Sequence, residues 1–294
     1  MYIPKNSTVW ILSTARKISY EEIIPAIEFI KSCELEVCIG NTIGKEHHQF
    51  AGNEDLRSQD FQAAINDPNT KAIWCARGGY GTIQIIDKID FSNYIKRPIP
   101  IIGYSDITVI HSHLHNLGIQ TIHATMPVDV KNNSELALKS LKDIFFNKKI
   151  KYTIPSSKKN RQGKTTGKLV GGNLSILYSM LGSKSSINTD DKILFIEDID
   201  EYLYHIDRML MNLKRNGYFD HLAGLIVGSF TKMNDNEIPF GKTIEEIILD
   251  ITSEYKFPIL FEFPAGHTND NRALIFGKEV IMNVNDIDAT IEFC

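Results

Sequence analysis

Short apolar runs alternate with longer amphipathic segments through the first half of the chain. Val9–Leu12 and Ile99–Ile102 are such runs and predict buried strands. Ser19–Cys33 predicts a helix, because Ser19 is a suitable N-cap and two glutamates follow in the first turn. Repeated strand–loop–helix units of this size predict a parallel sheet with helices on both faces, and therefore an α/β fold. Further strands are expected at 36–39 and 71–75, and further helices at 56–66, 82–89 and 107–117.

A polar stretch without periodicity interrupts this alternation. It includes Ser156–Lys164, whose composition is typical of a connecting segment. We therefore expect residues 1–152 to form an amino-terminal domain, 153–166 a linker and 167–294 a second domain. The second half again mixes both kinds of segment, with strands expected at 193–196 and 224–227, helices at 206–216 and 243–253, and a β-rich tail.

Composition limits the classes of partner and location. Hydrophobic residues make up 43%, charged residues 23%, and the formal net charge is −4. This balance argues against nucleic acid or an anionic membrane as a partner. No apolar run approaches the roughly 18 residues of a membrane span, and the amino terminus lacks the features of a secretory signal. The four cysteines match neither a zinc ribbon nor a disulfide framework, so we expect a cytoplasmic protein with reduced thiols.

Gly103-Tyr104-Ser105-Asp106 lies where the strand at 99–102 meets the next predicted helix. A serine at such a sharp turn exposes its hydroxyl, and the following amide and the helix start can face a developing oxyanion. Ser105 is therefore a candidate nucleophile. The alternative is a simple helix cap, since serine and aspartate both cap helices well. Ile107 also stands where the common Gly-x-Ser-x-Gly motif has its final glycine.

Three further segments at the ends of predicted strands carry candidate chemistry. Gly78-Gly79 precedes a helix, so its backbone can approach a ligand closely, although a tight turn also explains two glycines. Glu197 ends an apolar strand and could orient a histidine. An acidic helix start explains the carboxylates that follow it equally well. His267 follows a glycine in a loop after the apolar run 259–263, a suitable place for a general base or for an ordinary surface histidine.

Metal binding is a weaker interpretation of these residues. No His or Cys shares the acidic segment Glu197–Glu201 at ligand spacing. His111, His113 and His115 lie in a predicted helix, where only the first and last share a face, and the segment lacks an acidic partner. We expect no metal and no other cofactor.

Six motifs taken together resemble one family, the serine LD-carboxypeptidases, which include the microcin C self-immunity proteins. They span nearly the whole chain: Arg77–Gly81, Gly103–Asp106, Gly171–Leu174, Leu194–Asp198, Ile206–Leu210 and Gly266–His267. The resemblance implies a Rossmann-like amino-terminal domain, a smaller α/β carboxyl-terminal domain and an active site between them. It also implies a homodimer.

The resemblance also implies roles for single residues. Ser105 would be the nucleophile, His267 the general base and Glu197 the group that holds the imidazole. The backbone amides of Gly79 and Asp106 would form the oxyanion hole. The position of Arg77 beside Gly78 makes both candidates for substrate binding, with the guanidinium on a terminal carboxylate.

The substrate that the resemblance implies is the tetrapeptide of recycled murein, cut between the L-centre of its diamino acid and the terminal D-alanine. Asp200 and Thr268 replace frequent glycines of the family, and Ser13-Thr14-Ala15 replaces its usual Ala-Pro-Ser, which bears on substrate fit. One alternative is an immunity-type amidase acting on peptidyl- or aminoacyl-nucleotides. The compact chain, with Trp74 inside a predicted strand, favours the murein peptide. A non-catalytic ligand-binding relative and a metal-dependent hydrolase are further alternatives.

Overall fold

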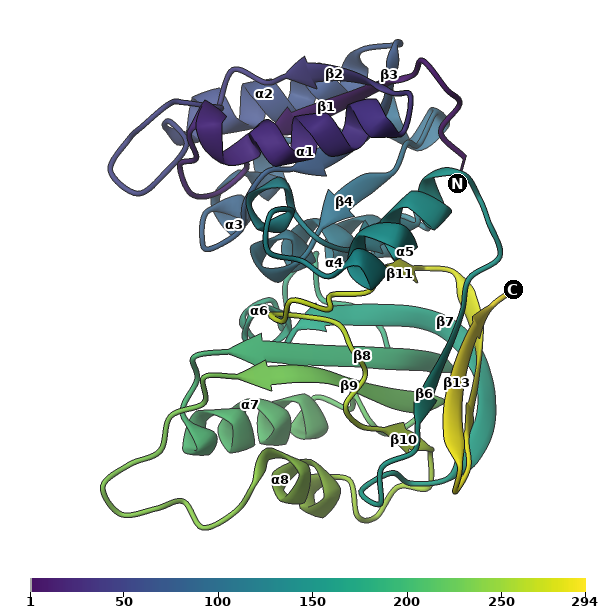
Figure 1. Ribbon diagram of the computed structural model, residues 1–294. Helices are drawn as coiled ribbons and strands as arrows, with labels where there is room; N and C mark the ends of the chain where they lie inside the picture. Colours follow the sequence, from purple (N-terminus) through teal and green to yellow (C-terminus); the bar gives the residue numbers. More distant parts are fainter. Residues whose placement is uncertain (1) are drawn as a thin grey trace.

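Two β-sheets, one above the other in Figure 1, form the framework of the computed structural model, which describes residues 2–294. The upper sheet has six strands in the order β11-β5-β4-β3-β1-β2. All neighbours are parallel except β11, which runs antiparallel to β5. The strands are β1 (Thr8–Leu12), β2 (Glu36–Ile39), β3 (Thr70–Cys75), β4 (Ile101–Gly103), β5 (Thr121–His123) and β11 (Leu274–Phe276).

The order of the parallel strands reverses between β1 and β3. In open α/β sheets, ligands bind beyond the carboxyl ends of the strands near such a switch point. The segments that follow β1, β3 and β4 therefore occupy the expected place for a site. They include the loop at 76–81 and the turn at Ser105.

Helices connect the strands of the upper sheet. In α1, Ser19 and Glu22 form a reciprocal capping box, and the buried Ile23, Ala26, Ile27 and Ile30 lie on one face. The helices are α1 (Tyr20–Ser32), α2 (Glu54–Asn66), α3 (Thr82–Ile85), α4 (Thr108–Asn116) and α5 (Glu135–Phe145), with 3-10 turns η1 (Ile86–Lys88), η2 (Tyr94–Lys96), η3 (Ser105–Ile107) and η4 (Pro127–Asp129). Among residues 2–294, no helix combines the length and the apolar character needed to cross a membrane.

The lower sheet has seven strands in the order β10-β9-β8-β7-β12-β13-β6. Its first four strands are parallel and the others antiparallel. The strands are β6 (Lys151–Pro155), β7 (Gly163–Asn173), β8 (Lys192–Ile199), β9 (Gly224–Thr231), β10 (Ile259–Leu260), β12 (Glu279–Val284) and β13 (Asp288–Phe293). The helices are α6 (Leu174–Ser179), α7 (Leu203–Arg215) and α8 (Ile244–Ile251), and α7 and α8 lie below the sheet in Figure 1.

The α/β fold with two domains agrees with the sequence prediction, and two strands connect the domains. β11 follows His267 in the chain but completes the upper sheet, and β6 leaves the upper domain to form an edge of the lower sheet. Residues 153–155 and 163–166 of the predicted linker lie in β6 and β7. The exact domain boundaries stay a prediction.

Candidate active site

Ser105 begins the 3-10 turn η3, directly beyond the end of β4. Its φ angle is 61°, a left-handed conformation that is uncommon for a residue with a side chain. Gly103 makes the turn possible, because a Cβ at that position would lie 2.8 Å from Cγ1 of Ile107. The strained backbone lifts the Ser105 side chain out of the turn, where it is partly exposed.

His267 connects Ser105 to a buried carboxylate. Nε2 of His267 lies 3.1 Å from Oγ of Ser105, and Nδ1 lies 2.7 Å from Oε2 of Glu197. The backbone amide of His267 also donates to Oε2, at 3.2 Å. The His267 side chain is 14% exposed and that of Glu197 is 0% exposed. Three side chains that the sequence placed at the ends of separate elements thus form one hydrogen-bonded chain.

The alternation of side chains along β8 explains the direction of Glu197. Phe195 and Glu197 share the face toward the upper domain, whereas Leu194 and Ile196 pack among the apolar side chains of α7. The loop after β10 then brings His267 to this face. Gly266 permits the approach: its φ is 108°, and a Cβ there would lie 2.7 Å from both Oε2 of Glu197 and Oγ of Ser229.

The electrostatics of His267 favour its charged form. Burial by itself lowers the pKa of His267, but attraction to Glu197, with smaller effects of Asp198 and Asp129, raises it above the ordinary value. A base whose conjugate acid is stabilised in this way accepts a proton readily. The arrangement can therefore remove the proton from Ser105 and hold the resulting imidazolium.

Tyr104 and Asp129 also support the imidazole, and the sequence analysis did not identify either. The ring of Tyr104 packs edge-on against that of His267, with centroids 4.9 Å apart, and its hydroxyl donates to Oδ2 of Asp129 at 3.0 Å. The position of Tyr104 directly before the candidate nucleophile was the available signal. Asp129, in η4, lies in a segment for which no element had been predicted.

The glycine loop after β3 packs directly on the Ser105 turn. A Cβ on Gly78 would lie 3.2 Å from Oγ of Ser105 and 3.4 Å from the amide nitrogen of Asp106. Gly79 has a φ of 108° and is exposed. The loop and the amide of Asp106 are thus neighbours, as an oxyanion hole built from both would require.

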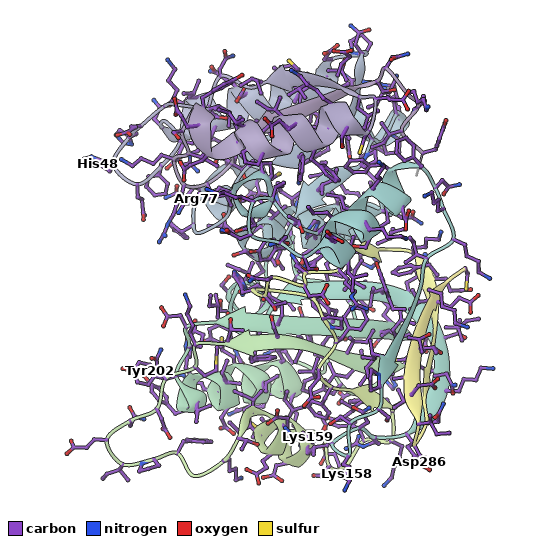
Figure 2. The ribbon with its side chains drawn as sticks, in the orientation of Figure 1. His48, Arg77, Lys158, Lys159, Tyr202 and Asp286 are labelled. Carbon is purple, nitrogen blue, oxygen red and sulfur yellow. The ribbon has the colours of Figure 1, made fainter. Side chains whose placement is uncertain are left out.

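Arg77 lies at the rim of the site, apart from the triad of side chains formed by Ser105, His267 and Glu197. Its Nη1 is 3.6 Å from Oε1 of Glu22 and 3.4 Å from the carbonyl oxygen of Lys17, and its side chain is 34% exposed. Figure 2 shows Arg77 on the upper domain, on the side toward which β8 and β9 point, with Tyr202 on the lower domain on the same side.

Asp198, next to Glu197, bonds to neighbouring segments of the lower domain rather than to His267. It accepts hydrogen bonds from Nδ2 of Asn173 and from the amide of Ser175, both at 2.8 Å. Burial, with repulsion from Glu197, raises the pKa of Asp198 to about 7. Asp198 thereby joins β8 to the segment after β7.

The histidines of α4 do not form a ligand set. His111 is buried, its Nε2 pairs with the carbonyl oxygen of Gly103 at 2.9 Å, and burial lowers its pKa to about 4. Within residues 2–294, no group of three or more His, Cys, Asp or Glu side chains has the proximity that a metal ion requires.

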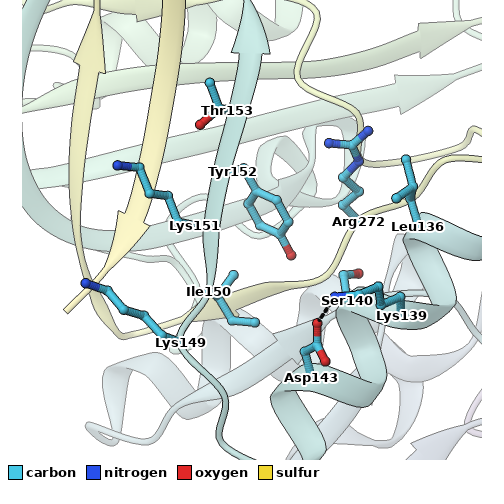
Figure 3. A pocket seen from close by; sticks show the side chains of 10 residues that line it. All are labelled: Leu136, Lys139, Ser140, Asp143, Lys149, Ile150, Lys151, Tyr152, Thr153 and Arg272. Carbon is cyan, nitrogen blue, oxygen red and sulfur yellow. Dashed lines mark hydrogen bonds and ion pairs between the residues drawn. The ribbon is translucent and has the colours of Figure 1, made fainter.

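A pocket of about 360 Å³ lies elsewhere, between α5 and β6 (Figure 3). Lys139 and Asp143 form an ion pair on its wall, and Arg272 closes one side. None of the triad residues lines this pocket.

The chain matches both domains of one protein family. Residues 9–124 match the LD-carboxypeptidase N-terminal domain and residues 166–282 the LD-carboxypeptidase C-terminal domain. A probable murein peptide carboxypeptidase of Bacillus subtilis is 35% identical, over 98% of this chain and 92% of its own. The crystal structure of a muramoyltetrapeptide carboxypeptidase from Oxalobacter formigenes is 25% identical, with a TM-score of 0.89 and 98% of each chain covered.

The microcin C7 self-immunity protein MccF of Escherichia coli is a more distant relative. It is 24% identical over 90% of this chain and 86% of its own. Its structure in complex with glutamyl sulfamoyl guanosine has a TM-score of 0.88 and covers 99% of this chain and 97% of its own. The extent of these matches, together with the carboxypeptidase relative that covers almost the whole chain, shows that this protein belongs to the LD-carboxypeptidase family and is a hydrolase of the serine carboxypeptidase class.

Proposed function

We propose that this enzyme hydrolyses the L,D peptide bond that holds the terminal D-alanine of the murein tetrapeptide, through an acyl-enzyme on Ser105. The observation that carries the proposal is the chain of hydrogen bonds from Ser105 through His267 to Glu197, with distances of 3.1 and 2.7 Å. The names of the relatives support a murein peptide as substrate. We further propose a role in peptidoglycan recycling in the cytoplasm. The homodimer that the motifs imply stays a prediction.

The mechanism begins with proton transfer. Neutral His267 takes the proton of Ser105 as Oγ attacks the carbonyl carbon of the diamino acid, since a serine hydroxyl is a weak nucleophile at neutral pH. The imidazolium then gives that proton to the nitrogen of the departing D-alanine. Water attacks the acyl-enzyme with His267 again as base, which releases the tripeptide and restores Ser105.

Glu197 and two backbone amides stabilise the charges that develop. Glu197 accepts from Nδ1, so the imidazole presents an unprotonated Nε2 to Ser105, and its negative charge favours the imidazolium. We assign the oxyanion to the amides of Gly79 and Asp106. Removal of one such donor costs about 3–4 kcal/mol of transition-state stabilisation in other hydrolases.

Arg77 is our candidate for the terminal carboxylate of the substrate. Its contact with Glu22 is 3.6 Å long and partly exposed to solvent, so it contributes little to stability. A substrate carboxylate can replace Glu22 at small cost and gain a bidentate contact with the guanidinium. Gly78 leaves space for the substrate beside Ser105 because it has no side chain.

The similarity to MccF favours a second candidate substrate. That relative is known in complex with an aminoacyl sulfamoyl nucleoside, so an amidase that cleaves peptidyl- or aminoacyl-nucleotides is the alternative. A non-catalytic relative with the same fold is a third. The same triad would serve either reaction, and therefore the substrate must be decided by direct assay.

The deciding experiment is mass spectrometry of the purified protein incubated with murein tetrapeptide or, in parallel, with an aminoacyl sulfamoyl nucleoside. We expect loss of one D-alanine from the tetrapeptide and no comparable cleavage of the nucleoside. Ser105→Ala should abolish both this activity and covalent labelling by a fluorophosphonate. Preferred cleavage of the nucleoside would replace the proposed substrate, and absence of labelling in the unmodified protein would contradict the proposed mechanism.

A further inference from the structure

The loop that carries the proposed oxyanion amide contains two glycines at positive φ. Gly79 and Gly81 have φ angles of 108° and 141°, conformations that glycine enters freely and also leaves freely. An oxyanion donor stabilises a transition state only when it is already held in place. Some other part of the molecule must therefore fix this loop.

Arg57, on α2, contacts the loop from within the protein. Its side chain is buried, with the residue 1% exposed, and Nη1 donates to the carbonyl oxygens of Gly81 and Thr14, each at 2.8 Å. Nη2 donates to Oε1 of Gln84, also at 2.8 Å. One guanidinium thus joins the segments that follow β1 and β3, on the two sides of the switch point.

Asp106 contacts the same loop from the nucleophile side. It is 1% exposed, and its Oδ2 accepts a hydrogen bond of 2.9 Å from the amide of Thr82, the residue after Gly81. Its own amide is the second proposed oxyanion donor. The Asp106 carboxylate therefore links the turn that contains one donor to the start of α3, directly after the loop that contains the other.

Both side chains are charged groups in a buried place, which is costly unless they are compensated. Burial raises the pKa of Asp106, while the contacts with Thr82 and the charge of Arg57 oppose that rise. Burial likewise lowers the pKa of Arg57, and the charge of Asp106 is among those that oppose it. Each charge thus makes the burial of the other less unfavourable.

We propose that Arg57 and Asp106 are positioning residues that hold the Gly78–Gly81 loop against the Ser105 turn and so keep the amides of Gly79 and Asp106 convergent. Neither side chain touches the reacting atoms in this assignment. The proposal rests on the proposed function, because it assumes that Ser105 is the nucleophile. It predicts a defect in transition-state stabilisation rather than in substrate binding.

The test compares Arg57→Met, Arg57→Lys, Asp106→Ala and Asp106→Asn with the unmodified enzyme. In Arg57→Met and Asp106→Ala, we expect kcat for D-alanine release and the rate of fluorophosphonate labelling to fall roughly ten- to hundredfold. This fall is no larger than the one that follows removal of a whole oxyanion donor. KM should change less than about threefold, as expected when transition-state contacts alone are lost. Asp106→Asn should recover most of the loss, because its amide oxygen can still accept from Thr82.

Arg97→Met is the matched control. Arg97 also donates to backbone carbonyls, those of Pro68 at 2.8 Å and Asp67 at 2.7 Å, but at the amino end of β3. Its removal should leave kcat and the labelling rate unchanged. Circular dichroism identifies the variants that fold. Where Arg57→Met does not fold, Arg57→Lys is measured instead, because it keeps the buried positive charge.

This inference would be overturned if the folded Arg57→Met or Arg57→Lys variant and the folded Asp106→Ala variant reacted at the rate of the unmodified enzyme. If Ser105→Ala did not react in the same experiment, the proposed function would still stand. An equal loss in Arg97→Met would also overturn it, because the effect would then be general destabilisation. An unmodified protein that does not react at Ser105 would overturn the proposed function as well.

Discussion

The proposed mechanism depends on one carboxylate that has no access to solvent. Glu197 is 0% exposed, and its Oε2 accepts hydrogen bonds from both Nδ1 and the backbone amide of His267. Burial therefore makes the attraction between Glu197 and His267 stronger than a surface pair would provide.

In the proposed mechanism, the raised pKa of His267 sets the pH dependence of the reaction. Only neutral His267 can take the proton of Ser105, so we expect kcat/KM to rise with pH and to reach half its maximum above pH 6.5, the ordinary value for histidine. In Glu197→Gln the charge that raises the pKa is gone. The rise of kcat/KM with pH should therefore occur at lower pH in this variant, while kcat falls on the order of 10³–10⁴-fold. A pH profile of Glu197→Gln that coincides with that of the unmodified enzyme would contradict this assignment.

The carboxyl ends of strands from both sheets carry the groups that we propose take part in the reaction. The Ser105 turn follows β4, the glycine loop follows β3, Glu197 lies near the end of β8 and His267 follows β10. Parallel strands make this arrangement possible, because their carboxyl ends share an edge. Two glycines stand where the backbone passes close to one of these side chains, Gly78 beside Ser105 and Gly266 beside Glu197.

Gly266 lies against Glu197 and directly before His267, and Gly266→Ala tests the need for a glycine there. A Cβ there would lie 2.7 Å from Oε2 of Glu197 in a backbone with a φ of 108°. We expect the substitution to lower the free energy of unfolding by about 1–3 kcal/mol and to reduce kcat roughly 100-fold through displacement of His267.

Gly241→Ala is the control for that experiment. Gly241 has a φ of 83°, but nothing lies within 4 Å of an added Cβ. Gly241→Ala should lower the free energy of unfolding in denaturant titrations, because of its strained backbone, and leave kcat unchanged. If Gly266→Ala kept full activity, the backbone at this loop would be less restricted than the contacts indicate.

A buried aromatic cluster joins the two halves of the molecule. Phe195 of β8 lies 5.0 Å from His123 of β5 and 6.1 Å from Phe276 of β11, measured between ring centroids. The next contacts lead from His123 to Tyr104 and from Tyr104 to His267, at 5.7 and 4.9 Å. The packing between the sheets is thus continuous with the proposed catalytic site.

Phe276→Ala removes a ring of this cluster that contacts both His123 of β5 and Phe195 of β8. Phe276 is 2% exposed, and we expect the loss of its ring to lower the free energy of unfolding by about 3–5 kcal/mol in urea titrations. Ile238→Ala, at a residue that is 85% exposed, should change it by less than about 0.5 kcal/mol. A small effect of Phe276→Ala would mean that the domains are held together by other contacts.

Local patterns in the sequence predicted most elements near the site. The apolar run at Val9–Leu12 is β1, and the capped segment after Ser19 is α1. The patterns failed where polar side chains cover an element. β7 was interpreted partly as linker because its exposed positions are lysine and threonine, and α5 lies in a lysine-rich region but buries a face that includes Leu141 and Phe145.

The sequence by itself determined the α/β class, the family and the three side chains that carry candidate chemistry, because turn residues and short motifs are local features. The tertiary structure decided which of them meet. Ser105 and His267 are 162 positions apart, and no local rule relates them. Their contact depends on how two sheets stack and on β11 crossing to the upper sheet. Likewise, no motif singles out the buried side chains of Arg57 and Asp106, which we propose hold the glycine loop, because their partners lie on other elements.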